Sequence, residues 1–322
     1  MDRYYPGLRM RARGSLPADI QTQMSDRRNR RSRVLVGLIL LGGFLVQCQQ
    51  ALRDQSAETP QVLVKGPAGV GDKVAFASPA PEQPRATETL EQRAARDPVG
   101  FIEDALEQYD RTVRDYTCTF TKQELVGGSL TKEQVMRAMF REKPFSVRLE
   151  WTRNADKCER VLYVADRWIE KGQQMAVVEP GWLARTFVSH VLRPIHGPDA
   201  KKSSRRTLDQ FGLRNSLSLT LKYIKRAEEL GKLDFSYQGK GEVDRRESLV
   251  FERRLPYTGE DGPWPDRVLV VHIDKELMLP LLCLCYADDE KQVLLGKYMT
   301  TDIKLNVNLS DTTFSKEGMG IQ

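Results

Sequence analysis

Residue types from which metal and hydrolytic sites are built are scarce in this chain. Its 322 residues include three histidines and five cysteines, and no two cysteines stand in a Cys-x-x-Cys pair. Zinc sites need such spacings of Cys and His, so we predict no metal site. The sequence also has neither a Gly-x-Ser-x-Gly motif nor a phosphate-cradling glycine loop. We therefore predict no cofactor, no catalytic residues and no enzyme activity.

Net basic charge is absent beyond the first 50 residues. Residues 1–50 hold nine Arg against three Asp, and the rest of the chain carries 41 basic and 41 acidic side chains. A nucleic-acid-binding domain needs a basic stripe on its folded surface, so we predict no nucleic-acid partner. Hydrophobic residues make up 40% of the chain, which is enough to build a sizeable core.

Only one long apolar run is present, VLVGLILLGGFLV at residues 34–46, and five arginines precede it. A membrane-spanning helix needs about 18 or more apolar residues, so this run predicts a secretory signal within residues 1–50. An uncleaved membrane anchor is the alternative. The true start is either Met1 or Met24, because MSDRRNRRSR alone is a normal signal start. We expect export to the periplasm or cell envelope, with or without a membrane anchor.

Two features follow the apolar run. The segment from Leu45 to Cys48 resembles the lipobox of bacterial lipoproteins, in which the Cys receives a diacylglyceryl group, although Gln47 is larger than that pattern has. Lipidation of Cys48 and a Cys near an ordinary cleavage site both remain open. Residues 51–96 are rich in Pro, Ala, Gln, Glu and Gly without apolar patterning, which predicts a disordered linker.

Residues 97–315 have the patterning of one α+β domain. Asp97 and Pro98 begin an amphipathic helix that ends near residue 114. Two more helices are expected at residues 181–192 and 217–230, and a hairpin with its turn at Gly239–Gly241 is expected over residues 233–256. Further strands are expected at residues 116–126, 135–142, 145–151, 160–169, 174–178, 268–273, 281–287 and 293–309. Strands in meander order predict a curved antiparallel sheet, an open half-barrel of about 10–11 strands covered by two or three helices.

Several short segments resemble, in their order along the chain, those of bacterial lipoprotein carriers of the LolA/LolB type. They are residues 142–151, 165–169, 271–274, 279–281, 302–306 and 309–314. The nearest family is an uncharacterised bacterial envelope family related to these carriers. The resemblance implies a half-barrel whose hydrophobic cavity accepts acyl chains. Loops at residues 201–206 and 257–265 depart from the carriers.

Apolar residues on the predicted strands are candidates for the lining of such a cavity. They are Phe120, Phe140, Phe145, Val147, Leu149, Trp151, Trp168, Val271, Ile273 and Leu305. A filled core is the alternative, because apolar alternation is what any half-buried sheet requires. Leu183, Phe187 and Val191 recur at a spacing of four and predict a lid helix, or else a permanently docked surface helix.

The basic segment KKSSRR at residues 201–206 is a candidate contact with the cytoplasmic-membrane surface, or else a solvated loop. Cys283 and Cys285 are two residues apart, so they share one face of a strand, where small buried thiols are common. Alternatively, one of them forms a disulfide with Cys118 or Cys158, or pairs with His272 as a nucleophile.

The leading hypothesis is a noncatalytic envelope protein that binds acyl chains, lipoproteins or other lipidated partners in a hydrophobic cavity. Two alternatives belong to different classes. One is an envelope sensor or scaffold that binds another protein and has no ligand cavity, and the other is a Cys-dependent enzyme.

Overall fold

The computed structural model describes residues 88–155 and 157–321. The predicted signal, Cys48 and most of the predicted linker lie outside these residues. The end of that linker forms the helix α1 (Leu90–Arg96). The Thr89 hydroxyl caps this helix, and its Ala94 is completely buried. The folded part therefore begins before residue 97. In the part of the chain that the structure describes, no helix has the length and apolarity to cross a membrane.

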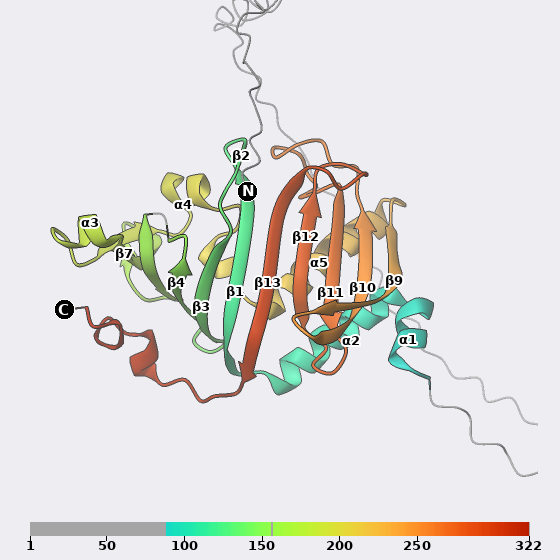
Figure 1. Ribbon diagram of the computed structural model, residues 1–322, viewed down its shortest axis with the longest axis horizontal. Helices are drawn as coiled ribbons and strands as arrows, with labels where there is room; N and C mark the ends of the chain where they lie inside the picture. Colours follow the sequence, from blue (N-terminus) through green and yellow to red (C-terminus); the bar gives the residue numbers. More distant parts are fainter. Residues whose placement is uncertain (1–87, 156, 322) are drawn as a thin grey trace, which may run out of the picture. The chain divides into compact units, whose positions relative to one another are not determined.

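One open antiparallel sheet forms the centre of the fold (Figure 1). Its strand order is β6-β7-β5-β4-β3-β1-β13-β12-β11-β10-β9, with β2 paired to β1 and β8 paired to β7. The predicted open antiparallel architecture is confirmed, with more strands than expected because three of them have two to four residues. The strands are β1 (Asp115–Val126), β2 (Ser129–Leu130), β3 (Gln134–Arg141), β4 (Ser146–Arg153), β5 (Cys158–Val164), β6 (Ile169–Glu170), β7 (Gln173–Pro180), β8 (Val191–Pro194), β9 (Asp234–Val243), β10 (Arg246–Arg254), β11 (Val268–Asp274), β12 (Pro280–Tyr286) and β13 (Leu294–Leu305).

Two long helices cover one face of the sheet, and Figure 1 shows them behind the strands. They are α2 (Pro98–Thr112) and α5 (Leu213–Glu229). The Asp97 carboxylate accepts a hydrogen bond from the Gly100 amide at 2.8 Å, as the predicted cap requires. Helix α5 begins four residues earlier than expected, at Leu213, whose amide donates to the Tyr116 hydroxyl at 3.2 Å. This bond attaches the start of α5 to β1.

Aromatic side chains hold α2 against the β9–β12 half of the sheet. The ring centroid of Phe101 on α2 lies 5.2 Å from that of Phe251 on β10. Phe251 also contacts the rings of Phe235 and Tyr237 on β9, at 5.7 and 5.6 Å. Phe101 and Phe251 are completely buried, so this cluster contributes strongly to the core.

The predicted helix at residues 181–192 is wrong. The chain there forms α3 (Trp182–Arg185), then an irregular stretch, and then β8, which pairs with β7. Leu183 and Phe187 are 64% and 89% exposed, so the spacing of four does not produce a buried helical face. Pairing of residues 191–194 with β7 satisfies their backbone groups instead.

The hairpin turn between β9 and β10 also differs from the prediction. It lies at Asp244 and Arg245, whose φ angles are +47° and +65°, and not at Gly239–Gly241. Gly239 occupies a β-bulge with φ +104°. A Cβ atom on Gly241 would lie 2.8 Å from the Val250 side chain, so this glycine permits close packing within the sheet.

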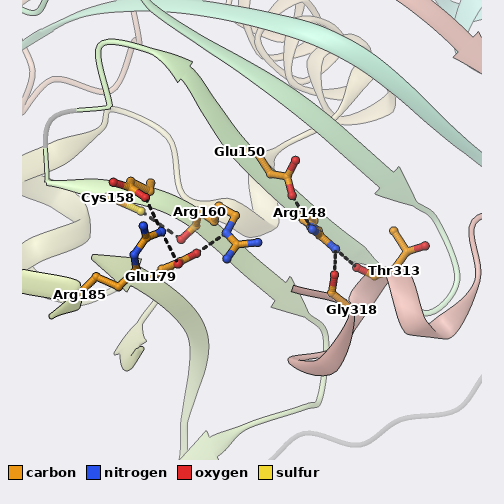
Figure 2. A network of polar contacts seen from close by, with 9 residues as sticks. Arg148, Glu150, Cys158, Arg160, Glu179, Arg185, Thr313 and Gly318 are labelled. Atoms are coloured by element: carbon orange, nitrogen blue, oxygen red, sulfur yellow. Dashed lines mark hydrogen bonds and ion pairs between the residues drawn. The ribbon is translucent and has the colours of Figure 1, made fainter. Parts of the chain in front are cut away.

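Arginines tie peripheral segments to the sheet (Figure 2). Arg148 on β4 donates to the carbonyl oxygens of Thr313 and Gly318 at 3.1 and 3.0 Å, which holds the C-terminal segment with its short helices η3 (Asp311–Phe314) and η4 (Glu317–Met319). Glu179 on β7 pairs with Arg160 and accepts from Arg185 at 3.0 Å. Burial raises the pKa of Glu179, but the two arginines outweigh this effect and the net shift is downward. Glu179 thus joins β5, β7 and α3.

Phe251→Ala is expected to lower the free energy of unfolding by about 3–5 kcal/mol, because it leaves a cavity between α2 and the sheet. Phe187→Ala removes the same atoms from a side chain that is 89% exposed, and its effect should be within about 0.5 kcal/mol. Urea titrations of both variants measure the difference. Equal losses in the two variants would contradict the proposed core.

Candidate functional site

A cavity of about 740 Å³ lies between the β1–β8 part of the sheet and the segment that leads into α5. Its walls come from β1, β3, β4, β5, β7 and β8, from residues 199–213 with part of α4 (Pro198–Ser203), and from α5, β12 and β13. Small-ligand sites in proteins typically enclose about 300–1,000 Å³. The space is therefore of a size that holds one small ligand.

Most of the cavity wall is apolar. The apolar part of the wall consists of inward-facing residues of β1, β3, β4, β5, β7 and β8. These residues share one face because alternate residues of a strand point to the same side of the sheet. They include Tyr116, Phe120, Met136, Leu149, Trp151, Val161, Ala176, Val178 and Val191. Such a wall favours a ligand with a hydrocarbon part.

The structure brings only some of the predicted lining residues to this cavity. Phe120, Leu149 and Trp151 line it. The other seven do not lie on its wall: Phe140, Phe145, Val147 and Leu305 pack in the core beside it, Val271 and Ile273 pack under α2 and α5, and Trp168 packs near the C-terminal segment. Of the predicted lid, Val191 lines the cavity, whereas Leu183 and Phe187 are exposed.

One end of the cavity is polar, and its centre is Glu124 on β1, which is 1% exposed. The carboxylate accepts hydrogen bonds from the Tyr298 hydroxyl at 2.7 Å, the Ser204 hydroxyl at 2.8 Å and the Lys122 ammonium at 3.1 Å. Burial raises the pKa of Glu124, but these partners outweigh burial and the net shift is downward. Glu124 is therefore a charged, fully hydrogen-bonded group that connects β1, β13 and the segment after α4.

A second buried ion pair joins β10 to the loop before β11. Arg253 contacts both carboxylate oxygens of Asp266, at 2.9 and 3.2 Å, and both residues are nearly inaccessible to solvent. The Arg253 guanidinium also donates to the Thr220 carbonyl of α5 at 3.4 Å and lies over the Tyr223 ring. The pair thus connects the sheet, the loop and α5 at the polar end.

The basic segment at residues 201–206 is only partly an exposed loop. Lys201 and Lys202 belong to α4 and are exposed. Arg205 and Arg206 are partly buried; the Arg205 guanidinium donates to the Pro265 carbonyl at 2.8 Å, and Arg206 lines the cavity. The alternative of a fully solvated loop at residues 201–206 is therefore wrong for residues 204–206, which are partly buried.

Exposed residues mark the opening of the cavity. Lys157, Arg193 and Lys202 belong to the lining and are exposed, and Asp199 is the acidic residue among them. Arg193 lies 4.0 Å from Asp199. Among the described residues, the opening consequently carries a net positive charge.

The four described cysteines are free thiols, and all of them line the cavity. Cys283 and Cys285 share the inner face of β12, as their spacing predicts. Val271 lies opposite Cys283 in the sheet, so its neighbour His272 points to the other face, where it contacts Ser248. The predicted pairing of a Cys with His272 is therefore not formed. Burial raises the pKa of Cys118, Cys158 and Cys285 to about 12, which disfavours thiolate chemistry.

The charged residues of the polar end were missed by the sequence interpretation. Lys122 and Glu124 follow Tyr116, Cys118 and Phe120 at every second position of β1. The same alternation that marks the apolar face thus places two charges on it. This signal was available in the sequence, but the partners of these charges lie about 80 and 174 residues further along the chain.

The fold and the cavity together define a class, that of large open antiparallel sheets that border an internal cavity. The chain belongs to the family described as "Protein of unknown function (DUF1571)", whose model matches residues 113–318. The predicted membership of an uncharacterised family is thereby confirmed. No curated protein matches the sequence significantly.

The chain is similar to several solved structures. A DUF1329 family protein from Desulfovibrio piger is 16% identical, with 69% of this chain and 99% of that chain covered and a TM-score of 0.36. A putative outer membrane lipoprotein-sorting protein domain from Vibrio parahaemolyticus is 14% identical, with 68% and 97% covered and a TM-score of 0.33. The Pseudomonas aeruginosa MucA/MucB complex contains a chain that is 16% identical, with 68% of this chain and 60% of that one covered and a TM-score of 0.39.

Arg253→Met is expected to destabilise the protein by about 3–5 kcal/mol, because Asp266 then remains buried without its counter-charge. The double variant Arg253→Met with Asp266→Leu removes both charges and should recover most of this loss. Urea unfolding of the two variants measures the comparison. A double variant as unstable as the single one would show that lost packing, not the unpaired carboxylate, is responsible.

Proposed function

We propose that this protein is a noncatalytic binding protein whose cavity holds the acyl chain of a lipid or of a lipidated partner. The observation that carries this proposal is the cavity of about 740 Å³ with apolar walls. Each methylene that leaves water for such a wall contributes about 0.8 kcal/mol, so a long chain gains enough to offset the cost of ordering it. The high pKa values of the buried thiols speak against the Cys-dependent enzyme.

The proposed place of action is the periplasm or cell envelope. The arginine cluster followed by an apolar run at residues 34–46 supports export, either with cleavage or with retention as an anchor. In either case a membrane is the source of acyl chains that is close to the protein. Acylation of Cys48 would keep the domain at that surface.

We further propose that residues 182–188 contact the membrane surface. Trp182, Leu183 and Phe187 are between 64% and 89% exposed, and large apolar side chains grouped in this way mark interaction surfaces. The segment leads directly into β8, whose Val191 lines the cavity beside the basic opening. Each basic side chain near an anionic leaflet contributes about 1 kcal/mol to membrane binding. Lys201 and Lys202 are exposed and are available for this contact. This role replaces that of a closed lid for Leu183 and Phe187.

The scaffold alternative uses the same exposed segment to bind a protein. It needs no internal space, whereas the acyl-chain proposal depends on the cavity being empty enough for a ligand. A substitution that fills the cavity therefore distinguishes acyl-chain binding from the scaffold alternative, because only acyl-chain binding should be lost.

Val178→Trp is expected to abolish copurification of acyl lipids, because the indole occupies the apolar part of the cavity. Val293→Trp is the matched control, since Val293 is 46% exposed and lies outside the cavity. Native mass spectrometry after gentle purification, followed by lipid extraction, detects the bound lipid. Absence of lipid from the unaltered protein and from the control would refute the proposal.

Trp182→Ser combined with Phe187→Ser is expected to reduce flotation with vesicles that contain anionic lipid, because it removes the exposed apolar contact. Binding of a soluble acyl probe should be unchanged, since neither residue lines the cavity. Flotation of the unaltered protein should weaken as salt is raised, because salt screens the basic groups. If the double variant floats as well as the unaltered protein, residues 182–188 are not the membrane contact.

A further inference from the structure

The charges at the polar end of the cavity do not balance. Glu124 is matched by Lys122, and Asp266 is matched by Arg253. Arg206 also lines the cavity, and within residues 88–321 other than Asp156 no carboxylate or carbonyl accepts a hydrogen bond from its guanidinium. One positive charge on the cavity wall, that of Arg206, is therefore left without a partner among the described residues.

The groups around Arg206 cannot supply the missing negative charge. Burial opposes the charged form of Arg206, but its pKa still lies above the ordinary value, so the guanidinium is charged; its ionisable neighbours are Tyr298, Cys285 and Asp266. Yet burial raises the pKa of Tyr298 well above its usual range and that of Cys285 to about 12, so both are neutral. The Asp266 carboxylate is held by Arg253 through both oxygens.

Hydrogen-bond donors are in excess in the same region. The Arg253 Nε and Arg205 Nη1 atoms are buried and have no acceptor among the described residues. Buried donors and charges without partners are costly, and proteins retain them where a ligand or ordered water completes the set. Guanidinium groups match carboxylate and phosphate oxygens in geometry and charge.

We infer that the ligand is a single-chain amphiphile with an anionic head group, whose carboxylate or phosphate pairs with Arg206 while its acyl chain lies along the apolar wall. This inference rests on the proposed function and adds the head-group class to it. The arrangement explains why one cavity has both an apolar wall and a basic end. The exposed basic residues at the opening favour entry of the same class of ligand.

The test compares ligands with one chain and different heads: dodecanoate, dodecyl phosphate and dodecan-1-ol. Each displaces a fluorescent acyl probe from delipidated protein at pH 8, where the carboxylate is ionised. The unaltered protein should bind at least one of the anions about 10- to 100-fold more tightly than the alcohol, as expected for a charge-assisted hydrogen bond in a partly dry site. The tighter of the two anions identifies the head group.

Arg206→Met should remove this preference by weakening the anions alone, with the affinity for dodecan-1-ol unchanged. Lys304→Met is the matched control, because it removes the same charge from an exposed position on β13 that lies outside the cavity. It should reduce anion affinity by less than about twofold, since exposed charges are screened. The melting temperature of ligand-free Arg206→Met should not fall, because the guanidinium has no partner to lose.

Two outcomes overturn the inference and differ in what they leave standing. Equal binding of the anions and the alcohol by the unaltered protein, or equal losses in the Arg206 and Lys304 variants, refutes the head-group site and leaves acyl binding intact. Failure of all three ligands to displace the probe refutes the proposed function as well.

Discussion

The architecture depends on how the inner face of a long open sheet is covered. Helices α2 and α5 pack tightly on the β9–β13 half, where Phe101 and Phe251 meet. Over the β1–β8 half the cover is the mostly irregular chain at residues 199–213, which contains the short helices α4 and η2 (Leu208–Gln210). Because this chain cannot fill the concave surface, an apolar space remains there. The cavity is thus a consequence of unequal cover, not of any unusual feature in the strands.

The polar end of the cavity is where distant parts of the chain are joined. Glu124 links β1, β13 and the segment after α4, and the Arg253 and Asp266 pair links β10, α5 and the loop before β11. Ion pairs at such depth contribute little to net stability relative to apolar residues of the same size, because desolvation offsets the attraction. Their hydrogen bonds to distant parts of the chain instead fix the position of the cover over the sheet.

Placement of the cysteines shows how burial decides chemistry. Four thiols line one cavity, yet burial keeps them protonated, and the strand register places His272 on the opposite face from Cys283. Nearby arginines lower the pKa of Cys283 and Cys285, but burial is the larger effect and the net shift is upward. Here they serve as small apolar groups in the wall.

The sequence by itself determined the class of the fold. Alternation in β1 and β4, the Asp97 cap with the α2 stripe, and the meander order were all visible, because each depends on residues close together in the chain. Local signals were misleading where tertiary contacts overrode them. Residues 181–192 have helical spacing but β8 pairs with β7, and Gly239 to Gly241 suggest a turn but form a bulge and a close contact.

Only the tertiary structure decided which apolar residues face empty space and which form the core. Phe120 and Leu149 line the cavity, whereas Phe140 and Val147, which lie on the same faces of their strands, are buried in the core. The difference arises from what lies opposite each side chain, and that is set by residues 199–213, far away in the chain. The partners of Glu124 and Arg253 likewise come from strands and loops that are distant in the chain, and no local pattern encodes their proximity. The same holds for the position of Arg206 on the cavity wall.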